Sequence, residues 1–165
     1  MSGRVGVGFD VHPFGGAGPL VLGGVTIDGP GLVGHSDADV VAHAVADALL
    51  GAAALPGAPD LGTLFPADDE RYRGADSLAL LADAAGRVAD AGWRLANADV
   101  SVVAETPHLA PHLPAMAERL GTALGALAPE AVSVKAKRAE GLGAIGRSEG
   151  IAAMAVVMLA TLDGL

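Results

Sequence analysis

Near its C-terminal end the chain carries a strongly apolar stretch, residues 151–162, in which Thr161 is the one polar residue. In a strand, successive side chains alternate between two faces. One face would carry Ala152, Met154, Val156 and Met158, and the other Ala153, Ala155, Val157 and Leu159. A strand that is apolar on both faces needs cover on both sides, so we expect it inside a layered fold. The run is too short for a membrane helix, which takes roughly 20 residues, and we expect no membrane contact.

The rest of the chain shows strand and helix patterns in turn. We expect strands at residues 4–12, 97–104 and 132–138, a hairpin at 20–27, and helices at 36–51, 76–91 and 111–125. Ser36 is the predicted N-cap of the first helix, with Asp39 as its capping-box partner. Residues 52–75 are rich in Pro, Gly and Asp, which is typical of a functional loop. We predict one domain over residues 1–165, an α/β fold of the α+β type with a mixed four-stranded sheet, helices on one face and a small hairpin.

Charge and cysteine content exclude several classes of function. The chain has no cysteine, so a disulfide framework, a thiolate nucleophile and a cysteine-bound zinc are excluded, and we expect a cytoplasmic protein. A net charge of −9 argues against nucleic acid as a partner, because such binding takes a basic face. The two lysines, Lys135 and Lys137, nevertheless lie near Arg138 and Arg147 in one short stretch. That local concentration predicts a phosphate site.

Asp10, His12 and His43 form the predicted metal site. Asp10 and His12 are two apart on a strand and therefore point to one side. On the first helix Asp39, His43 and Asp47 are spaced four apart, which places an imidazole between two carboxylates. Two imidazoles and a carboxylate on a divalent ion leave a position open for substrate. The alternative interpretation of His43 is a solvated helix histidine.

Four strings carry a family resemblance. GFDVHPF (8–14), GHSDADVVAHAVADALLGAAAL (34–55), DLGTLFPADDERYRGADS (60–77) and GLGAIGRSEGI (141–151) together resemble the 2-C-methyl-D-erythritol 2,4-cyclodiphosphate synthases of the non-mevalonate isoprenoid pathway. The likeness extends over about residues 4–159. It implies a phosphorus-oxygen lyase that converts 4-diphosphocytidyl-2-C-methyl-D-erythritol 2-phosphate to the cyclic diphosphate and releases CMP.

The resemblance also implies a role for each matching residue. Asp10, His12 and His43 would bind Zn²⁺, and Glu140 would hold a second divalent ion, Mg²⁺ or Mn²⁺, with the substrate diphosphate. The resemblance implies substrate contacts for the zinc ligands Asp10 and His12. It implies further substrate contacts for His35, Ser36, Asp60, Gly62, Phe65, Asp69, Ala104, Pro107, Glu140 and Arg147. His35 is credited with transition-state stabilisation; its alternative interpretation is packing against the first helical turn. Loop capping is the alternative for Asp60 and Asp69.

Some positions depart from the family pattern. Arg138 stands where a threonine assigned to transition-state stabilisation is usual, and we predict that its guanidinium takes over that catalytic contact. A solvated strand charge is the alternative. Lys137 also replaces a threonine, and His108 replaces a lysine beside the nucleotide. Ala144 replaces a phenylalanine that, with the arginine matching Arg147, lines an axial cavity said to accept isoprenoid diphosphates.

The resemblance further implies a homotrimer with its sheets facing the threefold axis and each active site shared by two subunits. Two other functions stay open at this point. One is a zinc-dependent phosphoesterase, in which a water attacks instead of the internal phosphate. The other is a non-catalytic trimer that binds isoprenoid diphosphates, which the residues at 138 and 144 motivate.

Overall fold

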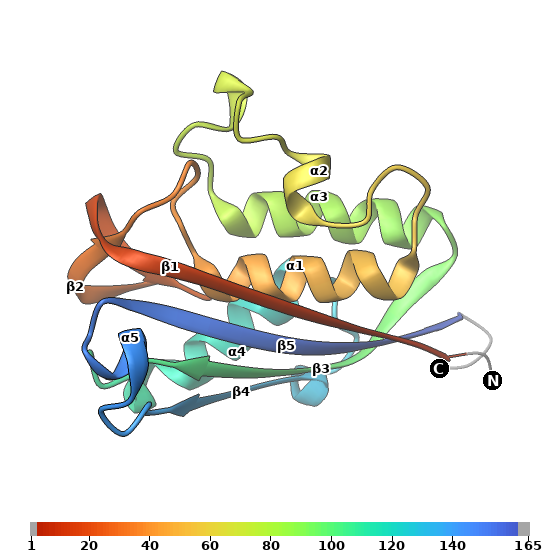
Figure 1. The fold of residues 1–165 in the computed structure, drawn as a ribbon. Helices are drawn as coiled ribbons and strands as arrows, with labels where there is room; N and C mark the ends of the chain where they lie inside the picture. The colour runs from red at the N-terminus through yellow and green to blue at the C-terminus, as the bar shows by residue number, and fades with distance from the viewer. Residues whose placement is uncertain (1–2, 162–165) are drawn as a thin grey trace.

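A five-stranded sheet is the base of the fold in the computed structural model, which describes residues 3–161 (Figure 1). Its strand order is β2-β1-β5-β3-β4. The strands are β1 (Gly3–Leu22), β2 (Val25–Leu32), β3 (Trp93–Val103), β4 (Val132–Lys137) and β5 (Gly150–Thr161). Only β3 and β4 pair in parallel, so the predicted mixed sheet is confirmed. Leu162, the predicted last residue of β5, lies outside the described residues.

The predicted number of four strands is wrong, because the hairpin is part of the main sheet. Strand β1 continues past His12: it pairs with β5 from Gly3 to Pro13 and with β2 from Phe14 to Leu22. The second pairing contains three register shifts between Phe14 and Leu20. Gly16 makes this irregular pairing possible, since an added Cβ would lie 2.0 Å from the carbonyl oxygen of Leu32.

The long helices cover one face of the sheet, as predicted. They are α1 (Val40–Ala53), α3 (Ser77–Asp90) and α4 (Leu113–Ala123). Sequence patterns missed the single turns α2 (Leu61–Leu64), α5 (Gly143–Gly146), η1 (Glu70–Tyr72), η2 (Ala110–His112) and η3 (Pro129–Ala131). Helix α1 lies between the sheet and α3, which explains why nearly all its side chains are buried (Figure 1). Within residues 3–161 no helix is long and apolar enough to cross a bilayer.

The start of α1 differs from the prediction. Its N-cap is Asp39 and not Ser36. Asp39 is fully buried, and its carboxylate accepts hydrogen bonds from the N–H groups of Val41 and Ala42 and from those of the hairpin residues Gly23 and Gly24. The carboxylate is therefore occupied by backbone donors. Nε2 of His43 contacts the hydroxyls of Ser36 and Ser77 instead, so the prediction that the carboxylates of Asp39 and Asp47 orient its ring is wrong.

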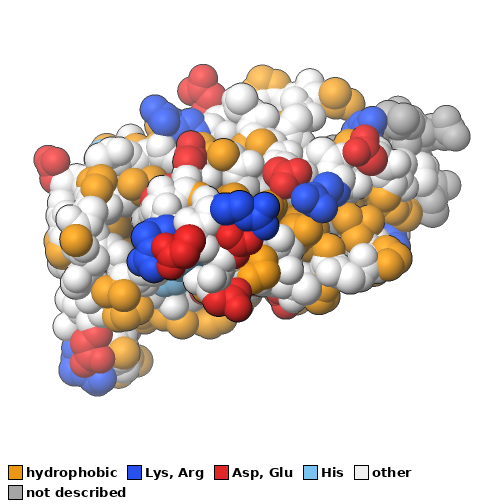
Figure 2. Space-filling view, turned by 90° about the horizontal axis from the view of Figure 1, so that it is seen from above, with side chains coloured by type: hydrophobic (Ala, Val, Ile, Leu, Met, Phe, Trp, Pro, Cys, Tyr) orange, Lys and Arg blue, Asp and Glu red, His pale blue; other side chains and the backbone are white. Residues whose placement is uncertain are grey.

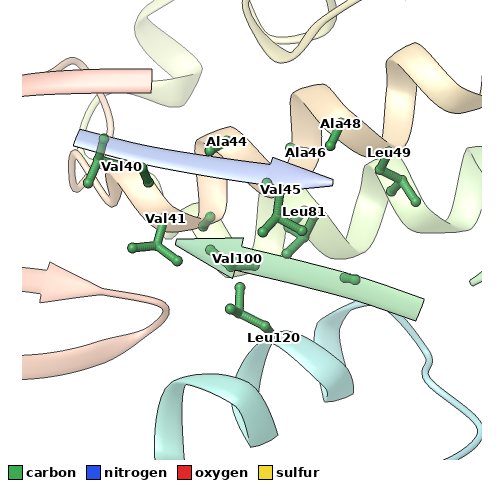
Figure 3. Close-up of a cluster of buried hydrophobic side chains, with 14 of the residues drawn as sticks. Val40, Val41, Ala44, Val45, Ala46, Ala48, Leu49, Leu81, Val100 and Leu120 are labelled. Atoms are coloured by element: carbon green, nitrogen blue, oxygen red, sulfur yellow. The ribbon is translucent and has the colours of Figure 1, made fainter. Parts of the chain in front are cut away.

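Small side chains let α1 lie directly on the sheet. Between Arg4 and His12 the residues of β1 at even positions face α1, and two of these, Gly6 and Gly8, are glycine. An added Cβ at Gly8 would lie 1.9 Å from the carbonyl oxygen of Ala44, and one at Gly6 would lie 2.0 Å from that of Ala48. Valines and leucines of α1, α3, α4 and β3 fill the space around this contact (Figure 3). Since Asp10 and His12 follow Gly8 on the same face, this contact places α1 and its His43 above them.

Replacing Gly8 with alanine tests this close packing. We expect the free energy of unfolding to fall by about 1–3 kcal/mol, because the methyl group would push α1 off the sheet. Urea unfolding of both proteins measures it. Gly51→Ala is the control, since a Cβ there meets nothing within 4 Å, and alanine should raise helix stability by about 0.5–1 kcal/mol. A Gly8→Ala protein as stable as the parent would contradict the close contact.

The other face of the sheet is apolar and open. Val5, Val7, Phe9 and Val11 of β1 are 49–67% exposed, and Met154, Val156 and Met158 of β5 are 41–49% exposed. The opposite side of β5 is fully buried at Ala153, Ala155, Val157 and Leu159. The expectation that both faces of the last strand are covered therefore holds for only one face within the described chain.

Candidate active site

Asp10, His12 and His43 converge as the sequence predicts. The Oδ2 atom of Asp10 lies 2.9 Å from Nε2 of His12 and 3.0 Å from Nδ1 of His43, and the two ring nitrogens are 3.3 Å apart. The three side chains are 16–26% exposed. Two imidazole nitrogens and a carboxylate oxygen that can reach one point are a donor set suited to zinc, with a further coordination position left open. The geometry thus fits a divalent metal ion.

The second nitrogen of each histidine ring also has a partner. Nδ1 of His12 lies 2.7 Å from the carbonyl oxygen of Val33, which can only accept a hydrogen bond, so Nε2 keeps its lone pair for a metal. Nε2 of His43 lies 3.1 Å from Oγ of Ser36 and 3.0 Å from Oγ of Ser77. Partners of this kind orient metal-ligating imidazoles.

The electrostatics of the cluster favour a cation. Burial alone would raise the pKa of Asp10, but hydrogen bonds with His12 and His43 outweigh it and lower that pKa well below its usual range. The hydrogen bond to Asp10 raises the pKa of His12. Burial also raises the pKa of Asp47 on α1, and the nearby charges of Asp60 and Asp10 add to this effect. Negative charge is thus concentrated at a site that a divalent ion would neutralise.

A cavity of about 280 Å³ opens beside the cluster. It brings His35, Ser36, Gly62 and Phe65 together with the three predicted metal ligands. Sequence reasoning missed its apolar lining by Leu61, Tyr72 and Leu80. The rings of Phe65 and Tyr72 pack edge to face, 5.2 Å between centroids. These residues come from the 52–75 segment and α3, where no periodicity indicated a shared wall.

Asp60 and Asp69 do not line this cavity. Asp60 caps α2 by accepting a hydrogen bond from the N–H of Thr63, and Asp69 caps η1 and pairs with Arg71. Hydrogen bonding to Arg71 lowers the pKa of Asp69 to about 2. The carbonyl oxygen of Asp69 lies 3.2 Å from Nε2 of His35, so this turn still contacts the site. Figure 2 shows acidic and basic side chains interspersed on this helix-covered side.

A second pocket of about 480 Å³ contains the predicted nucleotide residues Ala104 and Pro107, with His108, Lys137 and Arg138. Arg138 is 67% exposed and donates through Nε to Oε1 of Glu105, 3.0 Å away. This hydrogen bond lowers the pKa of Glu105.

The two pockets are well apart in one chain. Val11 of β1 pairs with Ala152 of β5, and Ala152 pairs with Val103 of β3. Val103 in turn pairs with Lys137 of β4, so β5 and β3 lie between Val11 and Lys137. Three strand spacings amount to roughly 14 Å. Glu140 and Arg147, the other two predicted site residues, line neither pocket. Arg147 donates through Nε to Oε1 of Glu149, 2.6 Å away.

Comparisons with known proteins find matches over most of the chain. The sequence model of the YgbB family matches residues 3–160. The chain is 55% identical over 157 residues to the 2-C-methyl-D-erythritol 2,4-cyclodiphosphate synthase of Moorella thermoacetica, and 94% of each chain is covered.

Solved structures are similar as well. The bifunctional IspDF from Campylobacter jejuni has a TM-score of 0.91 and 41% identity; the match covers 98% of this chain but 43% of that longer one. A CDP complex of IspF from Plasmodium falciparum has a TM-score of 0.81 and 30% identity, with 97% of both chains covered.

Proposed function

This chain belongs to the YgbB family, and from that membership we propose that it is a 2-C-methyl-D-erythritol 2,4-cyclodiphosphate synthase of the non-mevalonate pathway. The reaction closes the 2-phosphate of 4-diphosphocytidyl-2-C-methyl-D-erythritol 2-phosphate onto the β-phosphorus of its diphosphate and expels CMP. The observation that carries the proposal is the convergence of Asp10, His12 and His43 beside a cavity that also contains His35 and Ser36. In this proposal the metal ligands and the side chains that bind phosphate would share one site.

Asp10, His12 and His43 would hold Zn²⁺, and Glu140 would contribute to a second ion, Mg²⁺ or Mn²⁺, near the substrate diphosphate. These cations would supply Lewis-acid stabilisation of the negative charge on the reacting phosphates. Asp10 suits the role because its hydrogen bonds with His12 and His43 lower its pKa despite its burial, so the carboxylate stays charged in the folded chain. The two histidines suit it because each ring has a partner for its second nitrogen.

The side chains around the metal ligands position the substrate. His35 and Ser36 would donate hydrogen bonds to a phosphate group, and His35 would stabilise the transition state. Gly62 and Phe65 would hold the erythritol part, while the apolar wall that Phe65 forms with Tyr72 keeps water from the phosphorus centre. Asp60 and Asp69 would act partly through the turns that they cap.

The second pocket would hold the cytidine. The CDP complex of the Plasmodium relative supports a cytidine-linked ligand. Ala104 and Pro107 would border the base, and Arg138 would leave Glu105 to contact a phosphate. Arg147 would border an axial cavity for an isoprenoid diphosphate, with Ala144 leaving that cavity wider than a phenylalanine would.

We propose a homotrimer in which the apolar faces of the sheets meet around the threefold axis. The exposed valines, Phe9 and methionines of β1 and β5 form an open apolar face of the kind that marks a protein interface. In such a trimer the metal site of one subunit and the nucleotide pocket of the next would form one active site. This arrangement accounts for the separation of the two pockets within a chain.

The oxygen source of the product tests the proposal. Incubating the purified protein with zinc, magnesium and the diphosphocytidyl substrate in ¹⁸O-labelled water should give CMP and the cyclic diphosphate without solvent oxygen. Mass spectrometry of the products measures it. Solvent oxygen in a linear phosphate product would instead identify a zinc-dependent phosphoesterase. Zinc binding without turnover would identify a non-catalytic trimer that binds isoprenoid diphosphates.

A further inference from the structure

Ser77 is a buried side chain that contacts His43 on the side away from the metal site. It is the first residue of α3 and only 1% exposed, and its Oγ lies 3.0 Å from Nε2 of His43. We propose that Ser77, held by Asp37, is a positioning residue that sets the tautomer of His43. Nε2 then carries the hydrogen, and Nδ1 keeps its lone pair for the cation. This inference rests on the metal site of the proposed function.

The direction of the hydrogen bonds follows from Asp37. Its Oδ1 accepts from the Ser77 hydroxyl, and its Oδ2 accepts from the Ser77 N–H at 3.1 Å. The N–H of Asp39 also donates to Oδ1, at 3.1 Å. A serine hydroxyl has one hydrogen to give. Since that hydrogen is committed to Asp37, Oγ of Ser77 can only accept from His43, and Nε2 must be the donor.

The two histidine ligands differ in how their rings are fixed. His12 faces the carbonyl oxygen of Val33, which can only accept, so its tautomer needs no further support. His43 faces two hydroxyl groups, those of Ser36 and Ser77, and a hydroxyl can either donate or accept. Without Asp37, Ser77 could turn its hydrogen toward Nε2 and leave the hydrogen of the ring on Nδ1. Asp37 removes that ambiguity for Ser77, and the Ser36 hydroxyl can then give its hydrogen to Oγ of Ser77, 3.2 Å away, and accept from Nε2.

Helix capping does not account for the hydroxyl of Ser77. The N-cap of α3 is Asp76, whose carboxylate accepts from the N–H of Leu78 at 2.9 Å. The Ser77 hydroxyl is directed instead at Asp37, His43 and Ser36. The remaining structural role of the Ser77 hydroxyl would be to connect α3 to the loop before α1 through its hydrogen bond to Asp37. A test must separate that role from the effect on His43.

The test uses the full chain and zinc alone. Zinc affinity is measured by competition with a chromogenic chelator for the parent, Ser77→Ala and Ser77→Thr proteins. We expect Ser77→Ala to weaken zinc binding about 10- to 100-fold, as loss of a partner to a ligating histidine does. Ser77→Thr keeps the hydroxyl and should restore most of the affinity. Asp76→Ala is the matched control, because it weakens the same helix end without touching His43.

A second measurement reads the tautomer itself. In zinc-free Asp37→Asn the amide can donate to Ser77, so Nε2 of His43 should lose its hydrogen, while Nδ1 carries one beside Oδ2 of Asp10, 3.0 Å away. Nitrogen-15 NMR of the ring distinguishes the two forms, and it decides the matter even where Ser77→Ala fails to fold. An unchanged Nε2–H tautomer, or unchanged zinc affinity in folded Ser77→Ala, would overturn the inference. A parent protein that binds no zinc would instead overturn the metal site itself.

Discussion

Replacing His43 with alanine is expected to remove bound zinc and to lower the rate of CMP release on the order of 10³-fold. The size follows from the several kcal/mol that a Lewis-acid ion supplies to transition-state charge, since each 1.36 kcal/mol is a factor of ten in rate. Alanine is a good helix former, so α1 should remain folded. Elemental analysis of the purified protein gives its zinc content, and a coupled assay of CMP release gives its rate.

His112→Ala is the matched control for that experiment. His112 precedes α4 and makes no capping hydrogen bond through its side chain, and it lines neither the metal cavity nor the nucleotide pocket. We expect the His112→Ala protein to have the same zinc content and the same rate of CMP release as the parent protein. Full cyclisation by a His43→Ala protein that lacks zinc would refute the proposed role of this cluster. A His43→Ala protein that keeps its zinc but loses activity would show that His43 acts in the reaction and is not needed to bind the metal.

Placing a charge on the open face of the sheet should separate the subunits. Val7 is 67% exposed in the single chain, so a Val7→Glu protein should fold normally as a monomer. In the proposed trimer the same carboxylate would be buried without a partner, which costs several kcal/mol per subunit. We expect sedimentation equilibrium to show monomers where the parent protein is a trimer. Because each active site would be shared, activity should fall together with the trimer fraction.

Leu127→Glu is the control for the added charge. Leu127 is 76% exposed and lies beyond α4, away from the sheet face, so the substitution should change neither assembly nor activity. A Val7→Glu protein that remains trimeric would show that subunits meet through another surface. A monomer with the full parent activity would show that one chain contains a complete active site.

Local patterns in the sequence predicted the elements that local forces control. The apolar spacing of α3 and α4 and the β-branched segments of β3 and β4 gave elements within a few residues of those observed. Patterns failed where a distant contact decided the outcome. Asp39 was expected inside the first helix, yet the turn at Gly23 and Gly24 supplies two of its four backbone donors and makes it the cap. These partners lie 15 and 16 residues apart, a separation that neither a helix nor a strand period relates.

The candidate site also contains residues that the sequence predicted and residues that only distant contacts bring to it. The two-residue spacing of Asp10 and His12 was sufficient to predict that they lie on one side of a strand, and the matching strings named His43 as their partner. Nothing in the sequence pattern indicated Ser77, because its role depends on the crossing of α3 and the loop before α1. The same holds for the wall that Phe65 forms with Tyr72.

The sequence by itself determined which chemical groups are present and which of them share a strand or a helix, because side-chain direction repeats with the backbone period. It also determined the glycines of β1 that leave room for α1. Only the tertiary structure decided that α1 lies against those glycines and so brings His43 within 3.0 Å of Asp10. Contacts between segments distant in sequence depend on packing of the whole core, and local periodicity carries no information about that packing.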